Sequence, residues 1–341
     1  MANDYCTQVV DDPAHIDRAA WDALLDADAE ANPFLRHEYF AALTASGAAA
    51  GPSGWHPRFL LLTRDAQLAA AAPLYAKDHS YGEYVFDWSW AEAYQRYGLA
   101  YYPKWLVAVP FTPVPGTRLL ARDEPARTAL AAALLAHAKA SGMSSLHVLL
   151  APERDIEPLA RAGLLVRDGV QFHWRNAGYA SFEEFLAQLA QPKRKKIRAE
   201  RRKVAQAGVV LERKVGGEIT EADWRFFFRC YLATYRAHFS SPYLNLEFFL
   251  RIGATMPQHL MLVLARRGGR PVASALGVFD TRRDEPRLHG RYWGAVEQID
   301  CLHFECCYYQ MIEFAIERRL MWFEGGAQGA HKLARGLDPV A

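Results

Sequence analysis

The order of the predicted secondary-structure elements occurs twice along the chain, and this repeat restricts the possible folds more than any single motif does. In the first half we predict a hairpin, two strands, a helix and a short strand, at residues 58–75, 84–90, 105–110, 124–141 and 146–150. In the second half we predict a hairpin, a strand, a helix and a strand, at 259–279, 288–295, 302–319 and 321–324. The two sets lie about 180 to 200 residues apart and agree in pattern, not in letters. The sequence therefore predicts an α/β fold (α+β, with mixed sheets) in two domains of similar build, residues 1–165 and 166–341.

Length and composition agree with two domains. At 341 residues the chain is too long for one ordinary small domain, and its hydrophobic content of 51% is enough for sizeable cores. No run of about 18 apolar residues and no signal-peptide pattern occurs, so we predict no membrane span and a cytoplasmic protein. Five cysteines, an odd number, favour a reducing compartment over a disulfide framework. The chain stops at LDPVA without a closing element, and we expect a natural C-terminal tail to be missing.

A strongly basic segment, residues 193–203, lies near the start of the second predicted domain. Eight of its eleven residues are Lys or Arg and one, Glu200, is acidic, which gives a local charge of +7 in a chain whose net charge is +2. Gln191-Pro192 begins a helix of about four turns here, on which Ile197 and Val204 form one narrow apolar stripe. Most of the helix circumference is cationic and cannot be core.

Three interpretations of this basic helix are open: a solvated surface, a wall that binds the phosphates of a substrate, or a strip that contacts RNA backbone. Lys and Arg both suit phosphate, and Arg can bind it bidentately. No aromatic side chain is interleaved with the charges, so base stacking is not expected. The candidate phosphate-binding residues on this helix are Lys193, Arg194, Lys196, Arg198, Arg201 and Arg202.

Four segments of the second half are distinctive in combination. They are Lys193-Arg194-Lys195-Lys196-Ile197-Arg198 with the later Ala207-Gly208-Val209, then Gly290-Arg291-Tyr292-Trp293-Gly294, Phe323-Glu324-Gly325-Gly326, and His331-Lys332-Leu333-Ala334-Arg335-Gly336. Together with the helix at 302–319, they resemble the FemAB-like (Fem-type) branch of the GNAT acyltransferase superfamily. The resemblance covers about residues 170–339, and the first half matches only in the order of its elements. His331 and Ala334 stand where that branch has phenylalanine and glycine.

This resemblance implies a tandem GNAT architecture and the transfer of an acyl or aminoacyl group to a primary amine. Acyl-CoA or aminoacyl-tRNA would be a co-substrate, with no permanently bound cofactor. Lys332 and Arg335 would stabilise charge that develops at the acyl carbonyl, and Glu324 would act as a general base or position the amine. Tyr292 would contact the substrate. A surface loop and a capped turn acid are the structural alternatives for Lys332 and Glu324.

The bacterial proteins that this chain resembles are described as peptidoglycan-biosynthesis-like, with unassigned substrates. The expected partner is therefore a phosphorylated or nucleotide-linked small molecule, with tRNA as a further option. The donor, the acceptor and the oligomeric state stay open, as does a catalytic or structural role for the first domain.

Three further candidates come from the residues alone. His303 begins the long helix and is a candidate acid or base, although a structural histidine at a helix start is more common. The segment 95–100 fits the acyl-CoA pattern Q/R-x-x-G-x-G/A through Gln95, Gly98 and Ala100, whose backbone N–H groups would hold a pyrophosphate at a helix start. The aromatic run at 81–105 could line a cleft, although a packed sheet is the more common outcome.

No metal site is predicted, because Cys301, Cys306 and Cys307 do not have the spacing of a ligand set. Our leading hypothesis is an N-acyltransferase. The alternative is a non-catalytic RNA- or nucleotide-binding protein on a GNAT scaffold, motivated by the same basic helix.

Overall fold

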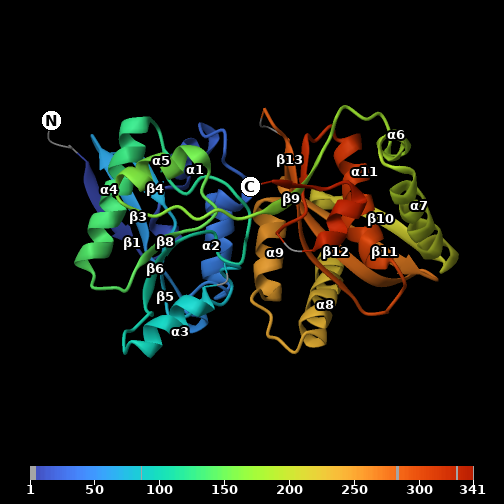
Figure 1. Cartoon of the computed structure of the whole chain (residues 1–341), viewed down its shortest axis with the longest axis horizontal. Helices are drawn as coiled ribbons and strands as arrows, with labels where there is room; N and C mark the ends of the chain where they lie inside the picture. The colour runs from blue at the N-terminus through green and yellow to red at the C-terminus, as the bar shows by residue number, and fades with distance from the viewer. Residues whose placement is uncertain (1–4, 86, 282–283, 328, 341) are drawn as a thin grey trace. The chain divides into compact units, whose positions relative to one another are not determined.

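The computed structural model describes residues 5–85, 87–281, 284–327 and 329–340. The chain divides into two compact units, Met1–Arg167 and Asp168–Ala341. This division lies two residues after the boundary predicted from the sequence. Each unit has a mixed α/β fold, as expected (Figure 1).

Unit 1 contains two four-stranded sheets and five helices among its described residues. The first sheet has the order β1-β3-β4-β7 and the second the order β2-β5-β6-β8, in which β6 and β8 are parallel. The strands are β1 (Cys6–Val10), β2 (Trp55–Pro57), β3 (Phe59–Arg64), β4 (Gln67–Ala72), β5 (Leu74–Lys77), β6 (Lys104–Val107), β7 (Leu120–Ala121) and β8 (Leu146–Val148). The helices are α1 (Arg18–Asp26), α2 (His37–Ala45), α3 (Trp88–Arg96), α4 (Glu124–Ala140) and α5 (Glu153–Arg161).

The residues at the two ends of helix α4 explain where it begins and where it ends. The Asp123 carboxylate accepts a hydrogen bond of 2.8 Å from the Ala126 backbone N–H, and Pro125 occupies the first turn. Gly142 follows the helix with a φ of +70°, a left-handed conformation that costs glycine little. The predicted helix at 124–141 is therefore confirmed.

The predicted strand at 84–90 is wrong, because the chain forms α3 from Trp88 onward; Phe86 lies outside the described residues. The aromatic residues of this segment suggested a strand because such residues are enriched in sheets. In the structure, Ser80, Glu83 and Asp87 turn inward to hydrogen-bond the Lys104 ammonium, and this inward turn leaves a loop and a helix in place of a strand.

Unit 2 is built on a seven-stranded sheet with the order β10-β11-β12-β13-β14-β9-β15. The strands are β9 (Gln171–Arg175), β10 (Val209–Val215), β11 (Leu260–Arg267), β12 (Arg270–Asp280), β13 (Arg287–Ala295), β14 (Trp322–Glu324) and β15 (Asp338–Val340). The helices are α6 (Phe182–Gln188), α7 (Gln191–Gln206), α8 (Glu221–Ala237), α9 (Leu246–Thr255), α10 (Leu302–Phe304) and α11 (Gln310–Glu317). The predicted hairpin at 259–279 corresponds to β11 and β12.

The two faces of this sheet carry different helices (Figure 1). On one face, Met261 and Val263 of β11 join Leu288 and Phe323 in the main core, which α6, α7 and α11 cover. On the other face, Leu264 packs against α8. Alternate residues of a strand point to opposite faces, so the two cores are separated by the sheet itself.

The predicted helix at 302–319 is interrupted by a π-helical turn. Leu302–Phe304 and Gln310–Glu317 are α-helical, and Glu305–Tyr309 between them is π-helical. Such turns often occur at functional sites. None of the helices in the described ranges combines the length and the apolar content that a bilayer crossing needs.

Gly294 on β13 provides a test of how closely α8 packs on the sheet. A Cβ at this position would lie 1.8 Å from the Cys230 carbonyl oxygen of α8. We expect Gly294→Ala to lower the free energy of unfolding of unit 2 by about 1–3 kcal/mol or more, measured by urea denaturation. The control is Gly217→Ala, whose added Cβ meets nothing within 4 Å. Equal stability of the two variants would contradict the close packing.

Candidate active site

Strands β13 and β14 run parallel and then part, and the predicted catalytic residues lie around this point. The last paired residues are His289 and Glu324. Beyond them, the Gly325 N–H donates to the Phe172 carbonyl of β9 at 2.9 Å, and the Phe172 N–H donates to the Gly326 carbonyl at 3.1 Å. Strand β13 instead continues along β12 to Ala295. Open α/β sheets bind ligands outside the carboxyl ends of their strands at such points, so this divergence is the candidate site.

Glu324 lies buried on one side of the divergence in a cluster of basic side chains. Its carboxylate accepts hydrogen bonds from His289 Nδ1 at 2.9 Å and from the Arg287 guanidinium at 3.2 Å. His173 of β9 is its neighbour across the strand pair. Burial opposes ionisation of Glu324, but His289, His173 and Arg287 outweigh it and lower the pKa of this carboxyl to about 2. So strong an acid is a weak proton acceptor, which argues against Glu324 as the general base.

The sequence reasoning missed His289 and His173. His289 lies two residues after Arg287 and therefore on the same face of β13. This two-residue spacing was the sequence signal that could have identified His289 as a site residue. Burial lowers the pKa of His173, and its Nε2 has no hydrogen-bond partner in the described part of the chain. In these same ranges, no group of three or more His, Cys, Asp or Glu residues could hold a metal ion.

Lys332 lies on the other side of the divergence. Its ammonium donates to the Gly326 carbonyl at 2.9 Å and lies 5.6 Å from the centre of the Phe172 ring. Phe172 belongs to the core face of the sheet, opposite His173. Burial lowers the pKa of Lys332 to about 8. Lys332 and Glu324 therefore flank the same strand end from opposite faces.

His303 joins Lys332 on the core face. Its ring centre lies 5.4 Å from that of Trp293, on the part of β13 beyond the divergence, and 6.5 Å from that of His331. Burial, followed by the charges of His331, Arg335 and Lys332, lowers the pKa of His303 to about 4. His331, which the sequence reasoning also missed as a site residue, shares a hydrogen bond of 3.0 Å with the Tyr308 hydroxyl. The nearby charges of Arg335 and Lys332 thus disfavour the protonated forms of both histidines.

Arg335 differs from its predicted role because it is buried in an ion pair. One of its guanidinium nitrogens donates to both carboxylate oxygens of Glu200, at 2.8 and 2.9 Å. A second nitrogen donates to the His331 carbonyl at 2.8 Å, and the guanidinium lies 3.4 Å from the centre of the Phe304 ring. Arg335 thus fastens its segment to the basic helix and does not face a reacting centre.

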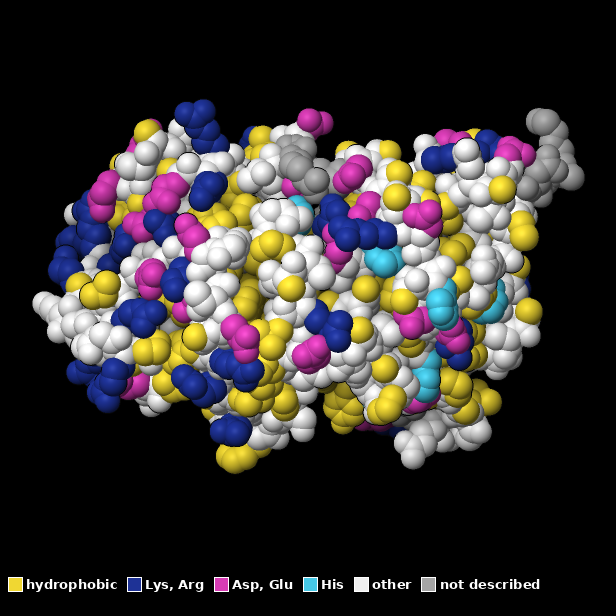
Figure 2. Space-filling view, turned by 180° about the vertical axis from the view of Figure 1, so that it is seen from behind, with side chains coloured by type: hydrophobic (Ala, Val, Ile, Leu, Met, Phe, Trp, Pro, Cys, Tyr) yellow, Lys and Arg dark blue, Asp and Glu magenta, His cyan; other side chains and the backbone are white. Residues whose placement is uncertain are grey.

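The basic helix, α7, separates into cations with partners and cations without them. Arg201 pairs with Glu313 at 2.7 Å and Glu305 at 3.1 Å, Arg198 pairs with Glu183 at 2.6 Å, and Arg194 donates to the Leu189 carbonyl at 2.6 Å. Lys193, Lys196 and Arg202 are exposed and have neither a hydrogen bond nor an ion pair within the described residues. Figure 2 shows Lys and Arg gathered over the edge of unit 2 that α7 forms. These three are the predicted phosphate ligands that remain available, and Lys195 and Lys203 of the same helix are likewise exposed without such partners among the described residues.

Two predicted groups lie elsewhere. Tyr292 points to the face covered by α8 and α9, where its ring centre lies 5.2 Å from that of Tyr231 and 6.1 Å from that of Phe249. It therefore does not share a face with α7. Gln95, Gly98 and Ala100 are exposed at the C-terminal end of α3 and the turn after it. A pyrophosphate cradle needs a helix start, so the predicted geometry is absent from these residues.

Unit 1 has a corresponding parallel pair, β6 and β8, joined through α4, but a buried side chain fills the position beyond it. The Arg118 guanidinium donates to the carbonyls of Leu149, Val114 and Gly116, each at 2.7 Å. The Asp155 carboxylate accepts from the Arg118 backbone N–H at 2.6 Å. This network makes the first unit's strand end a packed structural element and leaves unit 2 as the unit that carries the candidate site.

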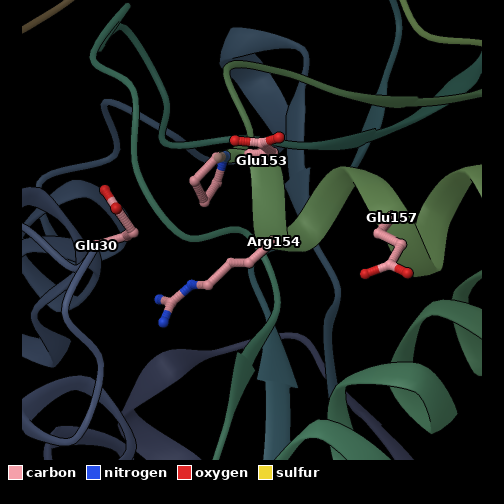
Figure 3. Close-up of a pocket in the computed structure, with 5 residues that line it drawn as sticks. Glu30, Glu153, Arg154 and Glu157 are labelled. Carbon is pink, nitrogen blue, oxygen red and sulfur yellow. The ribbon is translucent and has the colours of Figure 1, made fainter.

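A hollow of about 550 Å³ in unit 1 is lined by Glu30, Pro152, Glu153, Arg154 and Glu157 (Figure 3). Figure 3 shows the Arg154 side chain extending from α5 toward the segment that carries Glu30. Arg154 pairs with Asp28 and donates to the Thr117 hydroxyl at 2.7 Å. The lining is acidic overall, contains none of the predicted site residues and does not suit a phosphate.

These features define an α/β protein of two similar units, one of which places lysine and histidine side chains where two parallel strands part. The chain belongs to the FemAB-like family, described by peptidoglycan biosynthesis and recognition, whose model matches residues 12–341. This confirms the resemblance seen in the sequence and extends it into the first half. Family membership supports a transferase role. A search of curated proteins gives no match.

Among solved structures, FemX matches with a TM-score of 0.58 at 12% identity, covering 95% of this chain and 94% of FemX. The C-terminal domain of a putative lysylphosphatidylglycerol synthetase from Agrobacterium fabrum matches with a TM-score of 0.54 at 11% identity, covering 91% and 78%. L-PGS from Bacillus licheniformis matches with a TM-score of 0.53 at 11% identity, covering 93% and 77%. At these identities the likeness shows the fold alone.

The cluster around Glu324 makes the stability of unit 2 sensitive to acid. Because the folded state lowers the pKa of this carboxyl from 4.5 to about 2, its contribution is complete above pH 4.5 and is lost as the pH falls through about 2. We expect Glu324→Gln to lower the unfolding free energy by about 3 kcal/mol at pH 7 and by progressively less toward pH 2. Urea denaturation at several pH values measures this. The exposed Glu247→Gln is the control, and a Glu324→Gln deficit that does not change with pH would contradict the assignment.

The Glu200–Arg335 ion pair should be essential for the stability of unit 2. Arg335→Met leaves the Glu200 carboxylate buried without its cation, for which we expect a loss of about 3–5 kcal/mol. The exposed Arg202→Ala should change stability by no more than about 0.5 kcal/mol. Denaturation of both variants tests the pair, and a loss for Arg335→Met as small as that of the control would show that the pair is dispensable.

Proposed function

We propose that this protein transfers an acyl or aminoacyl group from an activated, phosphate-bearing donor to a primary amine, at the divergence of β13 and β14 in unit 2. The observation that carries the proposal is the position of Lys332 and His289 on the two sides of the strand end in a FemAB-like chain. The exposed cations of α7 provide the same unit with a surface suited to phosphate.

In such a transfer the amine attacks the donor carbonyl, the carbon–oxygen or carbon–sulfur bond to the leaving group breaks, and a tetrahedral oxyanion forms in between. The Lys332 ammonium has three N–H groups, of which one donates to the Gly326 carbonyl. The remaining donors can stabilise the oxyanion. The protonated form is required for this role, so activity should fall as the pH rises through about 8.

The attacking amine must also lose a proton. The Glu324 carboxylate accepts the Nδ1–H of His289, which leaves Nε2 as the ring nitrogen that could accept a proton. His289 thereby becomes the proposed base, and Glu324 acts through it as a positioning residue. This changes the role expected for Glu324 from the sequence.

The donor is acyl-CoA or aminoacyl-tRNA, and the family description favours a nucleotide-linked cell-wall precursor as the acceptor over a protein N-terminus or a small amine. Non-catalytic binding of RNA or a nucleotide is the second candidate. The exposed Lys193, Lys196 and Arg202 favour it, because an RNA partner needs unpaired cations.

A comparison of melting temperatures distinguishes these ligands, because a ligand that binds the native state raises the melting temperature with its concentration. The full chain is titrated with acyl-CoA, a UDP-linked muropeptide and aminoacyl-tRNA. We expect the stabilising donor to lose its effect in the triple variant Lys193→Gln, Lys196→Gln, Arg202→Gln. The matched control replaces three exposed cations elsewhere, Lys139→Gln, Arg167→Gln and Arg270→Gln. Loss of the effect in both triple variants would indicate a nonspecific charge effect and contradict a site on α7.

Lys332→Met separates catalysis from binding. With the donor found above and labelled in its acyl group, we expect transfer to the amine to fall at least a hundredfold while the donor still raises the melting temperature. The residual rate should no longer fall through pH 8. Unchanged transfer in this variant would exclude Lys332 from the reaction, and donor binding by the wild-type chain without any transfer would favour the non-catalytic alternative.

A further inference from the structure

One row of side chains crosses four strands of the unit 2 sheet and continues beyond the proposed base. His289 of β13 lies opposite Glu324 of β14. Glu324 lies opposite His173 of β9, which in turn lies opposite Asp338 of β15. Opposite residues of antiparallel strands share a face, with Cβ atoms about 4.5–5.5 Å apart. His173 therefore lies between two carboxylates, and imidazoles alternate with carboxylates along the row.

His173 is a member of this row with incomplete hydrogen bonding. The residue is only 7% exposed, and its Nε2 atom is buried without a hydrogen-bond partner within the described residues. An unpaired polar atom in the interior costs free energy, which an apolar side chain of similar size would avoid. A ligand that bonds to Nε2 would offset this cost.

Asp338 provides the solvent-exposed end of the row. Its carboxylate has neither an ion pair nor a hydrogen bond in the part of the chain that the structure describes. The oxygens of Glu324, in contrast, accept hydrogen bonds from His289 and Arg287. The available polar atoms of the row are therefore a buried imidazole nitrogen on His173 and, beside it, an exposed carboxylate.

The charges on this face of the sheet favour a cationic ligand. Among the described residues, Arg287 pairs with Glu285 at 2.7 Å and with Glu324 at 3.2 Å. Arg175 is a second guanidinium, two residues along β9 from the row, and Asp338 is a third carboxylate. Three carboxylates against two guanidiniums leave a net negative charge, which repels a phosphate and attracts an ammonium group.

The acceptor of the proposed reaction is such a cation. An alkylamine has a pKa of about 10.4 and is almost entirely an ammonium ion at pH 7, with three N–H donors. Burial lowers the pKa of His173, so its ring is neutral at this pH and can accept a hydrogen bond on Nε2 when its proton is on Nδ1.

We propose that His173 Nε2 and the Asp338 carboxylate bind the primary ammonium group of the acceptor substrate. The subsite lies on the same face as His289, separated from it by Glu324. It holds the amine in its charged form, before the proton is removed. Its role in the reaction rests on the proposed transferase function, whereas the binding of an ammonium group can be measured without any transfer.

The binding experiment uses the full-length chain with isotopically labelled histidine. Butylammonium and butyltrimethylammonium are titrated separately at pH 7, and NMR follows the Nε2 resonance of His173, which the spectrum of His173→Gln identifies. Both probes carry one positive charge, but only butylammonium has N–H donors. We expect butylammonium to shift this resonance to saturation and its trimethyl analogue to leave it unchanged.

Calorimetry with butylammonium then compares variants. Asp338→Asn and His173→Phe should each weaken binding about tenfold, because each removes an acceptor for a charged donor. His173→Gln keeps an acceptor oxygen and should bind more tightly than His173→Phe. The control Asp300→Asn neutralises another exposed carboxylate of unit 2 and should bind like wild type. The melting temperature of His173→Phe should not fall, since an apolar ring replaces an unpaired polar atom.

The subsite is overturned if the two probes act alike, if butylammonium leaves the His173 resonance unchanged, or if Asp338→Asn binds as tightly as Asp300→Asn. A lower melting temperature of His173→Phe with unchanged binding would assign His173 a structural role and also reject the subsite. Failure of the transferase proposal gives a different result: butylammonium binds as expected, but the chain transfers no acyl group to any amine.

Discussion

The buried ion pair between Glu200 and Arg335 organises unit 2, which carries the candidate site. It joins the middle of α7 to the segment that follows β14, across 135 positions of sequence. A buried ion pair is favourable only when its geometry is good and its remaining polar atoms are hydrogen-bonded. Here the Tyr309 hydroxyl donates to Glu200, and Arg335 donates to the His331 carbonyl. Lys332 lies three residues before Arg335 and Lys196 four before Glu200, so one contact sets the positions of both a proposed catalytic cation and a phosphate ligand.

The elements that local chemistry controls were predictable from the sequence. Asp123 and Gly142 mark the ends of α4, and Gln191-Pro192 begins α7. The buried stripe of Ile197 and Val204 on α7 was also predictable, because it needs only the helical period. The segment at 84–90 was not predictable in this way. Its conformation depends on Lys104, which lies in a strand about twenty residues later, and no property of the aromatic run itself shows that the neighbouring Glu83 and Asp87 turn inward.

In the candidate site, too, the positions of residues were predictable from the sequence, whereas the roles that depend on distant contacts were not. The family motif predicted that Lys332 and Glu324 lie near the end of the same strand, and the structure has both residues near the end of β14. It did not separate their roles, since the strong acidity of Glu324 comes from His289, His173 and Arg287 on two other strands. The charge count of the basic helix likewise could not show which cations are paired. Only the contacts of Arg201 and Arg198 with distant carboxylates reveal that Lys193, Lys196 and Arg202 remain available.

Because Glu305–Tyr309 forms a π-helical turn, the number of residues in this segment is as important for the site as their identities. A π turn holds one residue more than an α turn, and here the consecutive Tyr308 and Tyr309 reach separate partners, His331 and Glu200. Loss of one residue would restore a regular helix and rotate everything before it by about 100° relative to α11. His303 would then turn away from Trp293, although every side chain of the site was still encoded. Over evolutionary time this stretch can exchange residues far more easily than it can gain or lose one.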